Sequence, residues 1–398
     1  MPELPPFQLE RYFAEYEFNA PYLLSASDCE SLGLSELLGM AGPDVRRLWD
    51  ELSLGYTESP GHPLLREAIA GLYGAAGRDD VLVAAPEEAI FVFMQTLLSP
   101  GDEVVAVSPA YQSLHEVARS AGCTLTPWPL ALTAQGWQVD LERLESLLSA
   151  RIRLLVLNFP HNPTGCLPTK AEFEAILALA GRWGTYVFCD EMYRLLEYDP
   201  GLRLPPACDR YERAVSLGGM SKSLALPGLR IGWLATRAPG LRARWQQYKD
   251  YTTICSSAPS EILALIGLQA RQRILARNLA IIQANLGLAE AFCQRHGQLF
   301  RWIAPQAGSV AFPQWLGPGG AEQFCQAMVE RQGVMVVPGT MFDAAGQHFR
   351  VGLGRRSFGE ALARVEQGGP AFIQKSFLGY FWPTYGPKIT QRHLYYER

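Results

Sequence analysis

The chain has 398 residues, of which 48% are hydrophobic and 19% are charged, so it is too apolar for a disordered protein and long enough for two packed domains. Its 35 Lys and Arg residues against 39 Asp and Glu residues give a formal net charge of -4, which excludes a global basic field for nucleic acid or anionic lipid. The amino terminus lacks the basic start and apolar core of a secretory signal, and no apolar run reaches ~18 residues. We therefore expect a cytoplasmic protein with no nucleic-acid or membrane partner.

The eight cysteines lie far apart in the sequence, and none forms a CxxC pair. This spacing suits reduced, mostly buried thiols better than a disulfide framework or a zinc site. We expect no bound metal.

Short apolar runs alternate with helical stretches between residues 81 and 250. Runs rich in β-branched or aromatic residues predict strands over 81–85, 103–108, 154–159, 186–190, 214–219 and 230–236. Helical periodicity between them predicts helices near 87–98, 111–121, 169–183 and 240–250. This alternation predicts an α/β fold with a mainly parallel sheet between helices, in which ligands bind beyond the carboxyl ends of the strands.

The second half of the chain predicts a smaller α+β domain. Unbroken helical spacing over 258–295 predicts one long helix, and strand-like segments follow around a helix over 321–332. We expect an N-terminal arm (1–40) that joins the small domain, a large domain (41–285), the small domain itself (286–367) and an atypical tail (368–398). The role of this tail, in which eight of 31 residues are aromatic, stays open.

The segment SLGGMSKSLALPGLRIGW, residues 216–233, contains the most informative lysine. Lys222 follows a predicted strand and a glycine pair, and Arg230 comes eight positions later. A lysine hemmed in by small residues at a strand end can lose its proton and act as a nucleophile. A lone lysine is more often a solvated surface residue, so its neighbours decide between the two interpretations.

This segment resembles the cofactor lysine region of the class I and II aminotransferases, which are fold-type I pyridoxal 5'-phosphate enzymes with a seven-stranded, mainly parallel sheet. The resemblance implies that Lys222 forms a Schiff base with pyridoxal phosphate. It also implies that Ser221 and Arg230 hold the cofactor phosphate, a role for which a guanidinium is well suited because it donates paired hydrogen bonds. The alternative role for Arg230 is a structural ion pair.

Three upstream segments extend the resemblance. In CDEMYR, Asp190 matches the aspartate that keeps the pyridine nitrogen protonated, and Tyr193 matches a tyrosine that bonds the phenolic oxygen of the ring. In LNFPHNPTG, Asn162 matches the asparagine that donates to the same oxygen. In SPAYQSL, Tyr111 matches the aromatic ring that stacks on the cofactor. Taken separately, NPTG could be an ordinary turn and Tyr111 an ordinary core residue.

Two further matches concern the substrate and a second subunit. Arg350, in HFRVGLG, matches the arginine that binds the substrate α-carboxylate, and Asn162 and Tyr111 would line the same pocket. Tyr56, in GYTESPGH, resembles a tyrosine that reaches the phosphate of the neighbouring subunit, which implies a homodimer.

The phosphate turn departs from the family pattern. It reads AAPEEAI in place of a glycine-containing turn, so Pro86 offers no N–H while Glu87 and Glu88 bring negative charge toward a dianion. We still expect the amide of Glu87 to contribute to phosphate binding.

The resemblance implies an enzyme that acts on the α-carbon of an amino acid, most simply an aminotransferase with a 2-oxo acid as second substrate. The phrases APEEAI, NFPHNPTG and KDYTTICSSAPSE resemble capreomycidine synthase and its bacterial relatives, which favours β-elimination and cyclisation of a 3-hydroxyarginine as an alternative. A cofactor-binding sensor and a hydrolase using Ser221 with Lys222 are alternatives of other classes. Asp28 and Glu30 are candidates to receive a basic substrate side chain, although such carboxylates are more often solvated or cap helices.

Overall fold

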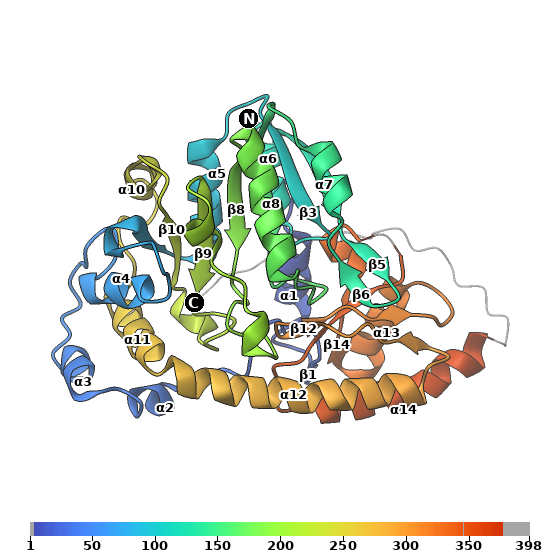
Figure 1. Cartoon of the computed structure of the whole chain (residues 1–398). Coiled ribbons are helices and arrows are strands. Elements are labelled where there is room, and N and C mark those ends of the chain that lie inside the picture. Colours follow the sequence, from blue (N-terminus) through green and yellow to red (C-terminus); the bar gives the residue numbers. More distant parts are fainter. Residues whose placement is uncertain (1–3, 345, 377–398) are drawn as a thin grey trace, which may run out of the picture.

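The computed structural model describes residues 4–344 and 346–376, and its central element is a seven-stranded sheet (Figure 1). The strand order is β2-β10-β9-β8-β7-β3-β4, and β10 is antiparallel to both of its neighbours while the other paired strands are parallel. This confirms the predicted α/β fold and its mainly parallel sheet. The strands are β2 (Val81–Ala84), β3 (Glu103–Ser108), β4 (Thr124–Pro129), β7 (Ile152–Asn158), β8 (Tyr186–Asp190), β9 (Ala214–Gly219) and β10 (Gly232–Thr236).

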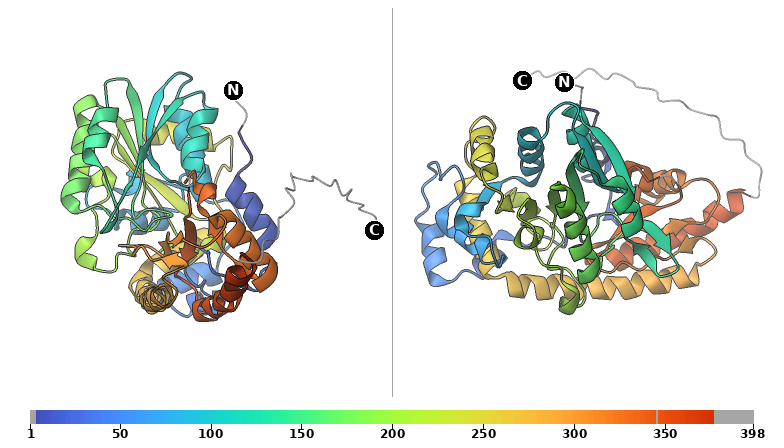
Figure 2. Two further views of the ribbon diagram at one scale, coloured as in Figure 1. Left: turned by 90° about the vertical axis from the view of Figure 1, so that its right-hand side faces the viewer. Right: turned by 45° about the horizontal axis from the view of Figure 1, so that its top comes forward.

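Helices cover both faces of this sheet, as Figure 2 shows. Alternate strand residues point to opposite faces, so Val104 and Leu154 pack in one core while Val105 and Leu155 pack in the other. The first core includes α5 (Pro86–Leu97), α6 (Ser113–Ser120) and α10 (Leu241–Lys249). The second includes α7 (Leu141–Leu147), α8 (Lys170–Trp183) and α9 (Ala207–Arg210).

The predicted long helix over 258–295 is wrong in one respect, because the structure has two helices. α11 (Ala258–Gln269) and α12 (Arg271–Arg295) meet at Ala270, whose φ of -85° and ψ of 6° leave the helical range. The sequence contains no breaker there, so the bend depends on packing. α11 packs in the core beside α3 (Pro43–Asp50) and α4 (Pro63–Ala70), whereas α12 runs along the base of the molecule (Figure 1).

α12 bonds to both halves of the chain. The Asn278 amide donates to the carbonyl of Ser223, and the Asn285 amide donates to the carbonyl of Leu353. The proposed domain boundary at 285 therefore falls inside a continuous helix, and the boundaries remain predictions.

Small sheets and helices form the second part of the chain. A three-stranded sheet has the order β12 (Val310–Ala311), β16 (Phe349–Gly352), β15 (Val337–Pro338). β11 (Phe300–Arg301) pairs with β13 (Gln314–Trp315), and α13 (Ala321–Gln332) matches the predicted helix. α14 (Phe358–Ser376) runs past residue 367, where we expected the small domain to end and the tail to begin. The remaining tail residues, 377–398, lie outside the described residues.

The arm crosses from this second part to the central sheet. After α1 (Gln8–Tyr16), β1 (Tyr22–Leu23) pairs in parallel with β14 (Val334–Met335). The following segment lies against β16, because the Gly352 amide donates to the Leu24 carbonyl at 2.7 Å. A Cβ on Gly352 would overlap the carbonyl of Ala26, so this close approach requires glycine.

The remaining elements surround this frame. The chain continues from the arm through α2 (Leu34–Leu38), α3 (Pro43–Asp50) and α4 (Pro63–Ala70), and β5 (Ala131–Thr133) and β6 (Gly136–Gln138) form a hairpin. Short 3₁₀ turns are η1 (Arg78–Asp80), η2 (Pro200–Leu202), η3 (Pro227–Leu229) and η4 (Gly339–Phe342).

Two whole-chain features complete the description. No helix in the described part of the chain has the length and apolarity needed to cross a membrane. All eight cysteines are free thiols and six of them are buried, as their spacing predicted.

Candidate active site

Most of the predicted site residues meet at one edge of the central sheet. Asn162, Asp190 and Lys222 come at or after the carboxyl ends of β7, β8 and β9, which are parallel and therefore end at the same edge. β10 runs the opposite way, so its beginning lies at this edge, and Arg230 comes just before it. The strand directions thus explain why one arginine can belong to a site otherwise built from strand ends.

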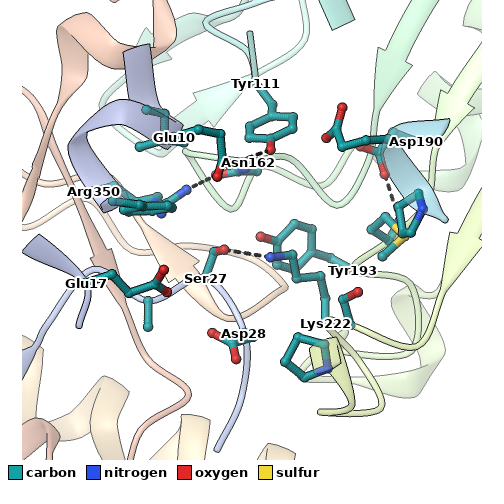
Figure 3. A pocket seen from close by; sticks show the side chains of 18 of the residues that line it. Glu10, Glu17, Ser27, Asp28, Tyr111, Asn162, Asp190, Tyr193, Lys222 and Arg350 are labelled. Carbon is teal, nitrogen blue, oxygen red and sulfur yellow. Dashed lines mark hydrogen bonds between the residues drawn. The ribbon is translucent and has the colours of Figure 1, made fainter. Parts of the chain in front are cut away.

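A cavity of about 710 Å³ opens at this edge. The structure brings together in its wall all but one of the predicted site residues: Glu87, Tyr111, Asn162, Asp190, Tyr193, Ser221, Lys222, Arg230 and Arg350. Figure 3 shows Lys222 and Tyr193 pointing into it, across from side chains of the N-terminal arm.

Lys222 is held by the arm. Its Nζ donates a hydrogen bond to Ser27 Oγ at 2.8 Å (Figure 3). Burial lowers the pKa of Lys222, and the nearby Arg350 adds to this effect, whereas Asp28 and Asp190 oppose it. The lysine therefore lies in the desolvated setting that its sequence context predicted.

Asp190 is the last residue of β8, Tyr193 comes three positions later, and both side chains are buried. Burial raises the pKa of Asp190 from 3.8 to about 7, although the Met192 amide donates to its Oδ1 at 3.0 Å and opposes that shift. The Tyr193 hydroxyl is buried and has no hydrogen-bond partner among the described residues. A cationic group beside Asp190 would offset the cost of burying its carboxylate. An oxygen beside Tyr193 would accept a hydrogen bond from its unpartnered hydroxyl.

Asn162 is positioned by Asn158, a residue of the same LNFPHNPTG segment to which the resemblance assigned no role. The Asn158 side chain donates to the Asp190 carbonyl at 3.0 Å and accepts the Asn162 amide at 2.8 Å. Asn158 therefore ties the turn after β7 to the end of β8. Its signal in the sequence was its place as the last residue of a buried strand.

The phosphate end of the cavity contains Ser221, Arg230 and Glu87. Ser221 Oγ is buried and unpartnered among the described residues, which leaves it available to an anion. Of the two glutamates in the turn, only Glu87 lines the cavity, because Glu88 accepts bonds from the Thr252 and Thr253 hydroxyls at 2.6 and 2.7 Å. Burial raises the pKa of Glu87, which favours the neutral form and weakens its repulsion of a phosphate.

Tyr111 lies in the wall between the phosphate end and the arm. Its hydroxyl donates to Glu10 Oε1 at 3.0 Å, and its ring centroid is 5.0 Å from that of Phe7 (Figure 3). The ring is thus available to stack on a planar group, while its hydroxyl is engaged by the arm.

Arg350 is 1% exposed and has no ion-pair partner among the described residues. Its guanidinium donates to Asn162 Oδ1 at 3.2 Å and to the Ser25 carbonyl at 2.9 Å, while its Nε has no partner. A buried, unpaired guanidinium that faces a cavity is a binding site for an anion.

Tyr56 is the predicted residue that the structure does not bring into the cavity. Its side chain is 92% exposed, on a segment between α3 and α4. Within one chain it therefore contacts none of the other predicted site residues that line the cavity.

The arm supplies two acidic residues that sequence reasoning did not identify, Glu10 and Glu17, together with Ser27. No periodicity or motif marks them, because they reach the cavity only through the folding of the arm. Of the two acidic candidates named from the sequence, Asp28 pairs with Arg355 at 2.9 Å, and Glu30 accepts the Arg356 amide and lies outside the cavity wall.

The cavity fits pyridoxal phosphate. Ser221 and Arg230 suit its phosphate, the Asp190 carboxyl suits a protonated ring nitrogen, and the orphan Tyr193 hydroxyl with Asn162 suits its phenolic oxygen. These groups share a single cavity with the desolvated Lys222.

Comparisons with known proteins agree with this geometry. The family described as aminotransferase class I and II matches residues 42–358. Capreomycidine synthase from Streptomyces vinaceus is 31% identical over 353 residues, with 88% of this chain and 89% of that protein covered. The aspartate/prephenate aminotransferase of Thermus thermophilus is 30% identical, with 77% and 80% covered.

A solved structure shares the whole architecture. A PLP-dependent aminotransferase from Streptococcus suis superposes with a TM-score of 0.86 at 27% identity, covering 94% of this chain and 99% of that one.

Proposed function

The chain belongs to the class I and II aminotransferase family, whose members use pyridoxal phosphate, and we propose that the residues around Lys222 transfer the amino group of an α-amino acid to a 2-oxo acid. The observation that carries this proposal is the buried, unpaired Arg350 in the same cavity as Lys222. An α-carboxylate bound there would bring the α-carbon of an amino acid toward the lysine.

The bound cofactor supplies an electron sink that stabilises negative charge at the substrate α-carbon. Asp190 would keep the ring nitrogen protonated, and Ser221 and Arg230 would hold the phosphate. Asn162 and Tyr193 would bond the phenolic oxygen, and Tyr111 would stack on the ring. Each role is supported by the position of that side chain in the cavity wall.

Lys222 would carry the cofactor and then move the substrate proton. Burial lowers its pKa, which favours the neutral amine that can accept the α-proton, and the same nitrogen can return that proton to a neighbouring carbon. Arg350 would orient the substrate by holding its carboxylate with paired hydrogen bonds.

The test uses the purified, cofactor-loaded protein with a panel of L-amino acids in deuterium oxide. NMR would follow exchange of the α-proton, and addition of a 2-oxo acid would reveal amino transfer. Lys222→Ala should abolish both activities, whereas Lys170→Ala, an exposed lysine at the start of α8, should leave them intact. Exchange that survives in Lys222→Ala would contradict the proposal.

A related lyase or cyclase is a second candidate, favoured by the similarity to capreomycidine synthase. Elimination from the β-carbon would use the same cavity residues but would need no 2-oxo acid. Product that accumulates from a β-hydroxylated amino acid in the absence of any 2-oxo acid would select this alternative.

We further propose a homodimer in which Tyr56 completes the partner's site. Leu54, Tyr56 and Tyr251 are large side chains that are 85%, 92% and 93% exposed. Their segments adjoin, since Ser59 Oγ donates to Asp250 Oδ1 at 3.0 Å. A second copy of the chain would bury this apolar surface.

A cytoplasmic location is the remaining proposal. It is supported by eight free thiols, which suit a reducing compartment.

A further inference from the structure

The arm places three carboxylates in the cavity wall: those of Glu10, Glu17 and Asp28 (Figure 3). Only Asp28 is neutralised by the protein, because both of its oxygens accept from Arg355 at 2.9 Å. Glu10 accepts from the neutral Tyr111 hydroxyl and has no ion-pair partner among the described residues. The Glu17 side chain receives no hydrogen bond or ion pair from the part of the chain that the structure describes.

The cationic side chains of the cavity wall each have a proposed or observed partner other than Glu10 and Glu17. Under the proposed function Lys222 carries the cofactor, Arg230 holds its phosphate and Arg350 binds the α-carboxylate, while Arg355 pairs with Asp28. None of these four is left for Glu10 and Glu17. Burial raises the pKa of Glu17, and the carboxylates of Asp28 and Glu10 add to this shift, whereas the nearby Arg355 and Lys222 oppose it.

A second observation shows that a ligand is expected in this space. Arg350 lines the same cavity, its Nε is buried without a hydrogen-bond partner among the described residues, and Glu10 is close enough to influence the guanidinium electrostatically. The arm side of the cavity therefore offers one site for an anion and, beside it, two carboxylates for a cation. A ligand that satisfies both has a carboxylate at one point and a positive charge at another.

We propose that the enzyme selects amino acids whose side chain ends in a cation, either a guanidinium or an ammonium group, received by Glu17 and Glu10. This inference rests on the proposed function, because Arg350 must hold the α-carboxylate for the side chain to point toward the arm. A neutral side chain of the same shape would leave both carboxylates unpaired and would be rejected on that account.

Arginine and citrulline provide a matched pair, since they have nearly the same size and shape and differ in charge. The wild-type, cofactor-loaded protein should exchange the α-proton of arginine with a kcat/KM at least ~10-fold above that for citrulline. Lysine and norleucine form a second pair and should show the same order.

Glu17→Gln should lower the ratio of kcat/KM for arginine to that for citrulline toward one, because it slows α-proton exchange of arginine and not of citrulline. Glu10→Gln, which keeps an acceptor for Tyr111, should lower the ratio too. The control is Glu15→Gln, which removes the same charge from an exposed residue of α1 outside the cavity and should preserve the ratio.

The outcomes separate the two proposals. Equal exchange of arginine and citrulline by the wild type, or a ratio that survives in the folded double variant of Glu10 and Glu17, would overturn the cationic substrate while leaving amino acid chemistry intact. No exchange with any amino acid of the panel would overturn the proposed function itself.

Discussion

Lys222 Nζ and Ser27 Oγ lie 2.8 Å apart, although 195 positions separate the two residues in sequence. The lysine follows the central strand β9, whereas the serine belongs to the arm that lies against β16. The arm therefore does more than cover the site, since it contributes a hydrogen-bond acceptor to the proposed catalytic amine. This acceptor stabilises the charged form of the lysine and so works against the effect of burial.

Ser27→Ala should lower the pKa of Lys222 further. The ammonium form loses its acceptor, worth about 1.5 kcal/mol for a charged donor, so the pKa should fall by about one unit. The pH midpoint for attachment of pyridoxal phosphate to cofactor-free protein should then move to lower pH. Ser35→Ala, in α2 and outside the cavity, is the control. A midpoint that stays in place or rises would contradict the role of Ser27.

Asp190→Asn should stabilise the cofactor-free protein in a pH-dependent way. Burial raises the pKa of Asp190 from 3.8 to about 7, so the folded state holds its proton more tightly than the unfolded state does. Stability from this group is complete below pH 3.8 and is lost as the pH rises through about 7. Because asparagine does not ionise, the advantage of the variant should grow by about 2–3 kcal/mol between pH 5 and pH 8.

Urea unfolding of both cofactor-free proteins at these two pH values measures this difference. Asp44→Asn, an exposed residue of α3, should show no such growth. A constant difference between Asp190→Asn and the wild type would show that Asp190 ionises normally in the folded protein.

Arg350→Lys should impair the reaction with amino acids but not the reaction with simple amines. One ammonium cannot reproduce the paired hydrogen bonds of a guanidinium, so kcat/KM for α-amino acids should fall by about 100-fold, mainly through KM. The rate at which a primary amine without a carboxylate displaces Lys222 from the cofactor should stay close to that of the wild type. Arg356→Lys, at an exposed position, is the matched control. Equal losses with both kinds of amine would remove Arg350 from carboxylate binding.

Mixed dimers test the proposed role of Tyr56. If Tyr56 serves the neighbouring site, a dimer of one Tyr56→Phe subunit and one Lys222→Ala subunit concentrates both changes in one site and leaves the other site intact. Activity should therefore return partly when the two weakly active variants are mixed and allowed to exchange subunits. Absence of recovery, with exchange proven by differently tagged chains, would mean that Tyr56 acts in its own subunit or not at all.

The strands beneath the site could be predicted from the sequence because both faces of each strand are buried against helices. β3, β8 and β9 have the predicted bounds, since a strand covered by helices on both faces is a short apolar run with clear ends. The residues at or just after the ends of these runs, among them Asp190 and Lys222, could be placed at one sheet edge on the same ground.

Other elements had no local signal. β4 was not predicted because it contains Pro127 and Pro129, which are tolerated where a strand forms the edge of a sheet. The break at Ala270 was not predicted either, because it reflects the different packing partners of α11 and α12 and no change in residue type.

The sequence by itself predicted the sheet from its apolar runs, and the resemblance to the class I and II aminotransferases supplied the expected cofactor lysine and the groups expected around the cofactor. Only the tertiary structure decided which arm residues face that lysine. Glu10, Glu17 and Ser27 reach the cavity because β1 pairs with β14 and the chain then crosses Gly352. Both contacts join segments that are more than 300 positions apart in the sequence, and no local propensity or periodicity specifies them. The residues predicted to hold the cofactor mostly follow strands that the sequence marks, whereas the proposed site for the substrate side chain depends on the packing of the arm.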